Sequence, residues 1–212
     1  MRKRTLIVFA ASLVAIGIFF FAGANPAARA GQAQAEKSPP KSGAQSQGTQ
    51  EVIFGKLVPY NHQSGWFTVS LPENWTVKDN STLKDNTLDE VILIVSDPTE
   101  NGIFVVRASA SKDLTPLELS TFLKTFVHDH MSTLDSFSMG EPLPLKGDTF
   151  HIIFRYTQTV QGNDFRMYGE SFIQQHNGYL GTITILIPQE QYSSKSKAAY
   201  EVTDSFHVTA KK

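Results

Sequence analysis

Apolar residues follow a strand-like pattern through most of the C-terminal part of the chain. They occupy alternate positions over residues 67–71, and residues 90–96 and 102–106 are apolar at nearly every position. Alternation indicates a strand with one buried face, and a short continuous apolar run is typical of a strand buried on both faces. Because the turn between the two runs ends in Asn101-Gly102, which favours positive φ, we predict that these strands pair antiparallel.

The second half of the chain predicts a three-stranded meander. Its strands cover residues 149–160, 165–175 and 179–187. Gly162-Asn163 and Asn177-Gly178 join them, and both pairs suit two-residue hairpin loops. Each strand should therefore run antiparallel to the next.

A well-marked helix is predicted before this meander. Thr115 and Glu118 form a capping box, and Pro116 occupies the first helical position. We therefore expect a helix over residues 116–134. Its apolar stripe consists of Leu119, Phe122, Leu123, Phe126 and Leu134.

A second helix is predicted after Pro188, ending near Thr203. The residues expected to face the core, in this helix and just beyond it, are Tyr192, Ala199, Val202 and Phe206. The order of strands, helix, long strands and helix predicts an α+β domain with a largely antiparallel sheet. Since several strands are apolar on both faces, helices or the N-terminal strand region should cover both sides of that sheet.

The N-terminus has the pattern of an export segment. Residues 1–4 read MRKR, and residues 6–24 form an uncharged, mostly apolar run. Ala28-Arg29-Ala30 has the small-x-small form of a signal-peptidase site, which favours a cleaved signal peptide within residues 1–30. The apolar run is also long enough to remain as a membrane anchor. In either case we expect everything after residue 30 to be extracytoplasmic, secreted or anchored by residues 6–24.

The rest of the chain divides into a linker and a domain. Residues 31–50 contain no large apolar residue and are rich in Gln, Gly, Ser, Ala and Pro, so we expect a disordered linker. Residues 51–212 remain as one globular domain, which is enough chain for a proper core.

Composition excludes several classes of protein. The chain is 41% hydrophobic and 18% charged, with a net charge of −1, and it contains no cysteine. Without the four basic residues of the export segment, 15 basic and 20 acidic side chains remain, which disfavours nucleic acid and anionic lipid as general partners. The absence of cysteine excludes disulfides, thiolate metal sites, thiol nucleophiles and a lipidated cysteine.

No motif for catalysis, a metal or a cofactor emerges. His128 and His130 lie two residues apart, about 200° around a helix, so they cannot chelate one ion; we expect His130 at the core edge and His128 on the surface. The acidic residues from Asp79 to Glu90, which we expect in a polar loop, lack the spacing of a calcium loop. Ser194 and Lys197 match Ser-x-x-Lys, but the companion motifs are absent. We therefore predict that the protein is not an enzyme and needs no cofactor.

One charged pair is of interest in the meander. If Gly162-Asn163 is the hairpin loop, Arg155 lies opposite Glu170, and the two form either a cross-strand ion pair under a helix or part of a cleft with His151. Trp66 and Trp75 bracket a turn, as packing anchors or as a partner-binding ridge. The five residues that could line a ligand or partner cleft are Arg155, Glu170, His151, Trp66 and Trp75.

Residues 64–75, SGWFTVSLPENW, resemble the G-F-x-I-x-x-P-x-x-W opening of the PsbP-like extrinsic photosystem proteins and the related DcrB-like and LpqN-like exported bacterial proteins. Later features agree in order over about residues 60–208. They are Ser96-Asp97-Pro98 with the Asn101-Gly102 turn, the helix start at Leu114–Glu118, and Ile187-Pro188 to Tyr192 leading to Ser205-Phe206. The resemblance implies a three-layer α/β/α sandwich around a largely antiparallel sheet.

The same resemblance implies a non-enzymatic binding or assembly role on the outer side of a membrane. The chain lacks the lipidated cysteine of many bacterial relatives and any residue set that marks photosystem attachment, so the photosynthetic role does not transfer. Our hypothesis is an exported, monomeric, non-catalytic protein that contacts a protein partner at the membrane or cell envelope. The alternative is a small-ligand or divalent-metal binding module of the envelope.

Overall fold

This computed structural model describes residues 50–84, 87–146, 148–160 and 162–209. The predicted export segment at residues 1–30 and the predicted linker, apart from Gln50, lie outside the described residues. In the ranges that are described, no helix has the length and apolar character needed to cross a membrane.

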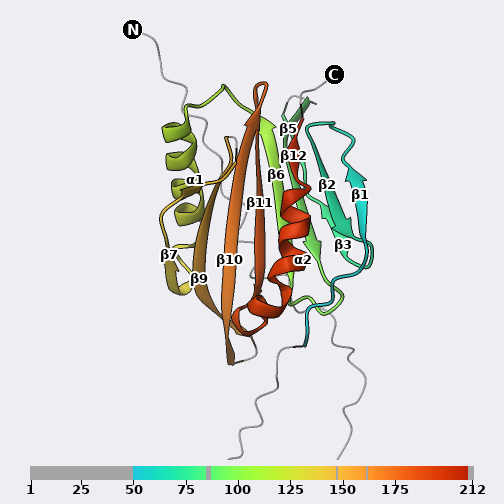
Figure 1. The fold of residues 1–212 in the computed structure, drawn as a ribbon, viewed down its shortest axis with the longest axis vertical. Coiled ribbons are helices and arrows are strands. Elements are labelled where there is room, and N and C mark those ends of the chain that lie inside the picture. Colours follow the sequence, from blue (N-terminus) through green and yellow to red (C-terminus); the bar gives the residue numbers. More distant parts are fainter. Residues whose placement is uncertain (1–49, 85–86, 147, 161, 210–212) are drawn as a thin grey trace, which may run out of the picture. The chain divides into compact units, whose positions relative to one another are not determined.

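A large antiparallel sheet forms the centre of the described domain (Figure 1). Its strands are β3 (Thr76–Asp79), β4 (Thr82–Lys84), β5 (Thr87–Ser96), β6 (Ile103–Ala110), β7 (Asp135–Met139), β8 (Leu143–Pro144), β9 (Phe150–Val160), β10 (Asn163–His176) and β11 (Tyr179–Pro188). They follow the order β3-β5-β6-β11-β10-β9-β7, with β4 beside β5 and β8 beside β9. The predicted antiparallel sheet and the meander of β9, β10 and β11 are confirmed.

Two further layers cover this sheet. A small sheet of β1 (Leu57–Asn61), β2 (Phe67–Pro72) and β12 (His207–Val208) lies with α2 (Tyr192–Asp204) on one face. The helix α1 (Pro116–Met131) packs on the other face, against β9 and β10. Neighbouring strand residues show the division: Val106 packs in the cluster that includes α2, whereas Arg107 contacts Phe126 and His130 of α1. The predicted three-layer α+β fold is confirmed.

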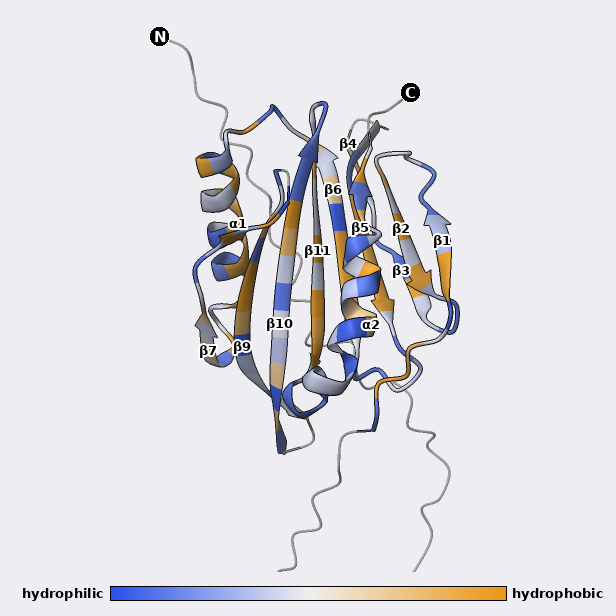
Figure 2. Cartoon of the chain, viewed as in Figure 1, coloured by the Kyte–Doolittle hydropathy of each residue, from blue (hydrophilic) through white to orange (hydrophobic). Residues whose placement is uncertain are grey.

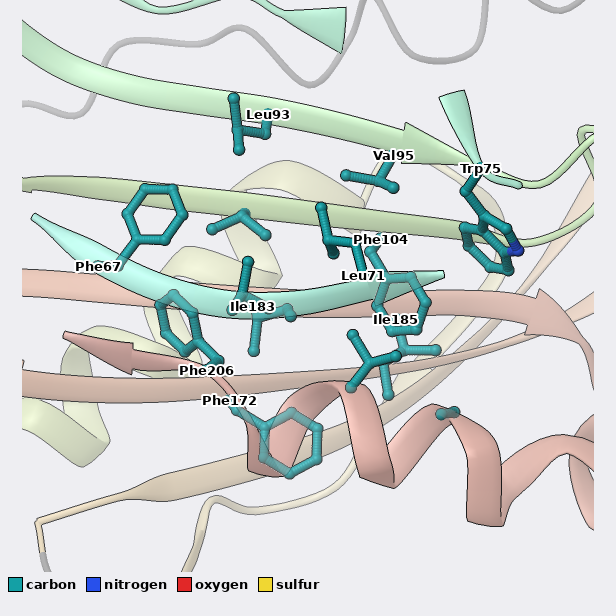
Figure 3. Packing of buried hydrophobic residues seen from close by; sticks show 14 of the residues in the cluster. Phe67, Leu71, Trp75, Leu93, Val95, Phe104, Phe172, Ile183, Ile185 and Phe206 are labelled. Carbon is teal, nitrogen blue, oxygen red and sulfur yellow. The ribbon is translucent and has the colours of Figure 1, made fainter. Parts of the chain in front are cut away.

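The main hydrophobic core lies between the large sheet, the small sheet and α2. Figure 3 shows side chains from β2, β5, β6 and β11 filling this interior. Its fully buried members include Phe67, Leu93, Phe104, Ile183 and Phe206. Burial of each such side chain stabilises the fold by roughly 1.5–3 kcal/mol. The strand pattern from 67 to 71 that predicted one buried face is therefore explained, since β2 turns its alternate apolar residues into this core.

The predicted capping box at the start of α1 is confirmed. Thr115 Oγ1 accepts the backbone N–H of Glu118 at 3.3 Å, and the Glu118 carboxylate accepts the N–H of Thr115 at 2.9 Å. Figure 2 shows hydrophobic and hydrophilic residues alternating along α1 and α2. However, α1 ends at Met131, not at residue 134, because the backbone turns there and Leu134 donates to the carbonyl of Met131. A short 3-10 turn (Gln189–Gln191) precedes α2.

Of the two predicted hairpin loops in the meander, the one between β10 and β11 is confirmed and the one between β9 and β10 is not. Asn177 and Gly178, at φ 47° and 79°, form the predicted loop between β10 and β11. Between β9 and β10 the loop ends at Gly162, which takes the left-handed conformation (φ 78°), because Asn163 already pairs with Val160. The predicted register between β9 and β10 is therefore wrong by two residues.

The turn between β5 and β6 is also closed differently from the prediction. The positive φ belongs to Glu100 (59°), not to Asn101 or Gly102. Instead, the buried Asp97 carboxylate accepts the backbone N–H groups of Asn101 and Gly102, each at 2.9 Å. The predicted antiparallel pairing of β5 with β6 is nevertheless confirmed.

Candidate functional site

Glu170 lies at the centre of a buried polar network on the α2 side of β10. Its side chain has no exposed surface. Its carboxylate accepts hydrogen bonds from His151 Nδ1 at 2.5 Å, from the Tyr168 hydroxyl at 2.8 Å and from the Tyr200 hydroxyl at 3.0 Å. The strand partner of Glu170 is Ile153, so the predicted cross-strand pairing of Glu170 with Arg155 is wrong. The buried charge is compensated by His151 and by two phenols instead.

Tyrosines connect this network to α2. The Tyr200 hydrogen is donated to Glu170, so its oxygen accepts the hydroxyl of Tyr192 at 2.8 Å. The rings of Tyr168 and Tyr192 stack with centroids 3.8 Å apart. Burial, the Tyr192 hydroxyl and the Glu170 charge raise the pKa of both Tyr168 and Tyr200 above the usual value of a phenol. Both phenols therefore remain neutral donors near neutral pH.

Arg155 belongs to the same side of the sheet but is exposed. It lies opposite Tyr168, with its guanidinium carbon 5.9 Å from the centre of that ring. Alternate β9 residues on this side are partly or fully exposed, whereas those on the other side are buried beneath α1. In Figure 1, α2 lies beside β11 and away from β9. We call the exposed strip the β9 face; it consists of His151, Ile153, Arg155 and Thr157.

The two tryptophans lie elsewhere. Trp66 and Trp75 are 5% and 6% exposed and belong to the hydrophobic core. Figure 3 shows Trp75 at one end of this core. The Trp75 indole N–H donates to the carbonyl of Ile53 at 2.8 Å, and its ring is 5.1 Å from Phe104. The structure thus brings Arg155, Glu170 and His151 to one region, and places both tryptophans as packing residues.

A second buried polar cluster lies on the α1 side. Arg107 of β6 is 3% exposed and donates to both carboxylate oxygens of Glu90, at 3.0 and 3.2 Å. It also donates to His130 Nε2 at 3.0 Å, while His130 Nδ1 donates to the carbonyl of Phe126 at 2.7 Å. Burial and the Arg107 charge lower the pKa of His130, against the opposing effect of the Phe126 carbonyl. The sequence predicted His130 at the core edge and His128 on the surface, and both placements are confirmed.

A third polar cluster consists of His62, Ser64 and Asp79, of which Asp79 is distant in the sequence from the other two. His62 follows β1 and is buried, with its ring stacked on Phe67 at 5.8 Å. Ser64 Oγ lies 2.9 Å from His62 Nδ1, and an oxygen of Asp79 lies 3.0 Å from His62 Nε2. Asp79 was expected in a polar loop, but it is the last residue of β3. The packing of the small sheet against the large one, which no local pattern reveals, brings this carboxylate to the turn after β1.

Metal ligation finds no support in the described ranges. They contain no group of three or more His, Cys, Asp or Glu side chains placed to hold an ion. The buried ionisable groups described above are engaged with one another.

Comparison with known proteins finds likeness in fold. No family model matches the chain, and no curated protein matches it in sequence. Its structure is similar to cyanobacterial PsbP (CyanoP) from Synechocystis, at 19% identity over 74% of this chain and 95% of that one, with a TM-score of 0.49.

Two further solved structures are similar at 12% identity. LpqN, involved in cell envelope biogenesis of Mycobacterium tuberculosis, matches over 73% of this chain and 91% of its own, with a TM-score of 0.44. The Saccharomyces cerevisiae Ran-binding protein Mog1p matches over 73% and 96%, with a TM-score of 0.47. These neighbours have the Mog1p/PsbP-like fold, and PsbP-like and LpqN-like proteins were both named from the sequence. At such identities the likeness concerns the fold alone.

Proposed function

We propose that this chain is an exported, non-catalytic protein that binds a protein partner on the outer side of a membrane through the β9 face. The N-terminal sequence supports export: a basic start, an apolar run over residues 6–24 and a small-x-small site at residues 28–30. Whether that segment is cleaved or kept as an anchor, the domain is delivered to the same side.

The uncovered β9 face is the observation that carries this proposal. Sheet surface beside a covering helix is normally packed, yet here Ile153 and Thr157 are partly exposed and Arg155 is exposed. Arg166 of β10, opposite Thr157, extends the strip and is exposed. Among the described residues neither arginine has an acidic partner within ion-pair distance. Arginines without an acidic neighbour in the described part of the chain, beside a half-exposed isoleucine, are suited to a protein interface.

The network beneath the strip makes this surface rigid. Tyr168, below Arg155, is held by its bond to Glu170 and by stacking on Tyr192. His151 is held through Nδ1 by the same carboxylate. A surface fixed in this way loses little conformational entropy when it binds, which favours affinity.

Photo-crosslinking tests the proposal. A photoreactive amino acid replaces Ile153 in the full chain, expressed in its own host, and a matched variant carries it at Lys197, which is exposed on α2. We expect a crosslinked protein in the membrane or envelope fraction from position 153 and not from position 197. No crosslink at 153, or the same crosslinks from both positions, contradicts the proposal.

A further inference from the structure

We propose that Ser64 is a nucleophile that accepts an acyl group from activated esters, with His62 as its general base and Asp79 as the residue that orients the imidazole. The inference rests on the three side chains after β1 and at the end of β3. It is independent of the β9 face.

The hydrogen bonds fix where each proton lies. The backbone N–H of Ser64 donates to His62 Nδ1 at 3.2 Å, so this nitrogen carries a lone pair. The ring proton is therefore on Nε2 and is donated to Asp79, 3.0 Å away. Since Nδ1 is an acceptor, the Ser64 hydroxyl at 2.9 Å donates to it. This is the proton arrangement that a serine nucleophile, its base and an orienting carboxylate require.

The environment holds this arrangement in place. The His62 side chain is 2% exposed and stacks on Phe67, so water competes poorly with Ser64 for the ring nitrogen. Partial burial alone would raise the pKa of Asp79, but hydrogen bonds from Ser81 and His62 outweigh it and hold that pKa below its usual value. The carboxylate is therefore ionised at neutral pH and keeps the proton on Nε2.

Ser64 is also accessible. Its side chain is only half-buried, and the next residue is Gly65, at φ 68°. Apart from Gly65 and its two chain neighbours, no residue has an atom within 4 Å of the position that a Cβ would occupy on Gly65, so the turn is open on that side. An ester of modest size can reach Oγ from this side.

The reaction is a simple acyl transfer. Ser64 Oγ forms a bond to the acyl carbon while the bond from that carbon to the leaving phenolate oxygen breaks. The hydroxyl proton passes to His62 Nδ1 and then to the phenolate, so no other reactant is needed.

The two backbone N–H groups next to Ser64 in the described turn are not free to stabilise an oxyanion, as rapid turnover would require. The N–H of Gly65 is bonded to the carbonyl of His62 at 3.0 Å, and the N–H of Trp66 points at Ser64 Oγ at 3.2 Å. Neither is placed to stabilise the oxyanion of a tetrahedral intermediate. We therefore expect Ser64 to take up one acyl group per chain without sustained turnover.

The test uses p-nitrophenyl acetate and the full chain. Peptide mass mapping follows acetylation of Ser64 and, as an internal control, of Ser193, which is exposed on α2. General base assistance contributes about 10²–10⁴ in rate, so we expect Ser64 to be acetylated at least about a hundredfold faster. A Ser64 rate no greater than that of Ser193 would overturn the proposal.

Two variants separate this role from a structural one. Ser64→Ala should lose the rapid acetylation. Asp79→Asn, at a side chain that is 40% exposed, should slow acetylation of Ser64 about tenfold or more while Ser193 reacts as before. Circular dichroism confirms that each variant is folded. If folded Asp79→Asn reacts at the wild-type rate, Asp79 does not orient the base and the assignment is wrong.

Discussion

The hydroxyl of Tyr200 on α2 donates a 3.0 Å hydrogen bond to the carboxylate of Glu170 on β10. Glu170 has no exposed surface, so this contact joins a surface helix to a charge inside the sheet. A buried carboxylate without donors is costly, and each donor removed leaves the charge less compensated.

Tyr200→Phe should therefore destabilise the fold. It removes one donor from Glu170 and leaves the Tyr192 hydroxyl without its acceptor. A hydrogen bond to a charged group contributes about 1.5–3 kcal/mol, and we expect a loss of this size in the free energy of unfolding measured with urea. Tyr179→Phe is the control, since Tyr179 packs on Trp66 through its ring. Equal losses in both variants would show that the Glu170 contact contributes nothing specific.

His130 should make stability depend on pH. Its folded-state pKa is lowered from 6.5, chiefly by burial, so the unfolded chain binds the proton more readily than the folded one. The contribution of neutral His130 is thus fully present above pH 6.5 and is lost as the pH falls from there through the lower folded-state pKa. Protonation would also place a cation against Arg107.

The measurement compares urea unfolding of the wild type and His130→Gln between pH 7.5 and 5. The wild type should lose more stability over this range, by at most about 1.4 kcal/mol per pH unit. His128→Gln, at an exposed position on the same helix, should follow the wild type. If His130→Gln shows the same pH dependence as the wild type, the effect belongs to other groups.

Much of the fold could be predicted because its signals are local. The capping box of Thr115 and Glu118 begins α1 where expected, and Asn177-Gly178 closes β10 onto β11. The register of β9 could not be obtained in this way, because Gly162 could be the first or the last residue of a two-residue loop, and the second choice moves Arg155 from Glu170 to Tyr168.

The candidate sites were harder to predict because they depend on tertiary contacts. Arg107 directly follows a run that predicts a fully apolar strand. The pairing of β5 with β6 brings it to Glu90, and the packing of α1 brings it to His130. The chain from Ser64 through His62 to Asp79 requires β3 to lie beside the turn after β1. The signal for Glu170 is a lone acid among buried strand residues, and the predicted register pairs it with Arg155, the wrong partner.

Close packing over Gly181 gives a prediction for the core. A Cβ at this position would lie 2.6 Å from Val208 Cγ2 and 2.8 Å from Phe206 Cζ, and Phe206 is fully buried. Gly181→Ala should cost about 1–3 kcal/mol, seen as a lower Tm. In Gly140→Ala the nearest atom is the Ile153 carbonyl oxygen at 3.7 Å, an ordinary contact, so its Tm should be nearly unchanged. A similar Tm for the two variants would mean that β12 moves aside freely.

The surface role of Arg155 gives the last prediction. Arg155 is exposed and its contact with Tyr168 is a single cation–π interaction, worth about 0.5–1 kcal/mol at an exposed site, so Arg155→Glu should change stability little. If the β9 face meets a partner, the reversed charge should nevertheless reduce crosslinking from position 153 severalfold, because an unfavourable charge at an interface opposes association. Lys197→Glu makes the same change of charge on α2 and should leave crosslinking intact. Equal reduction by both variants would indicate a general effect of net charge, and no reduction by Arg155→Glu would place the contact away from this arginine.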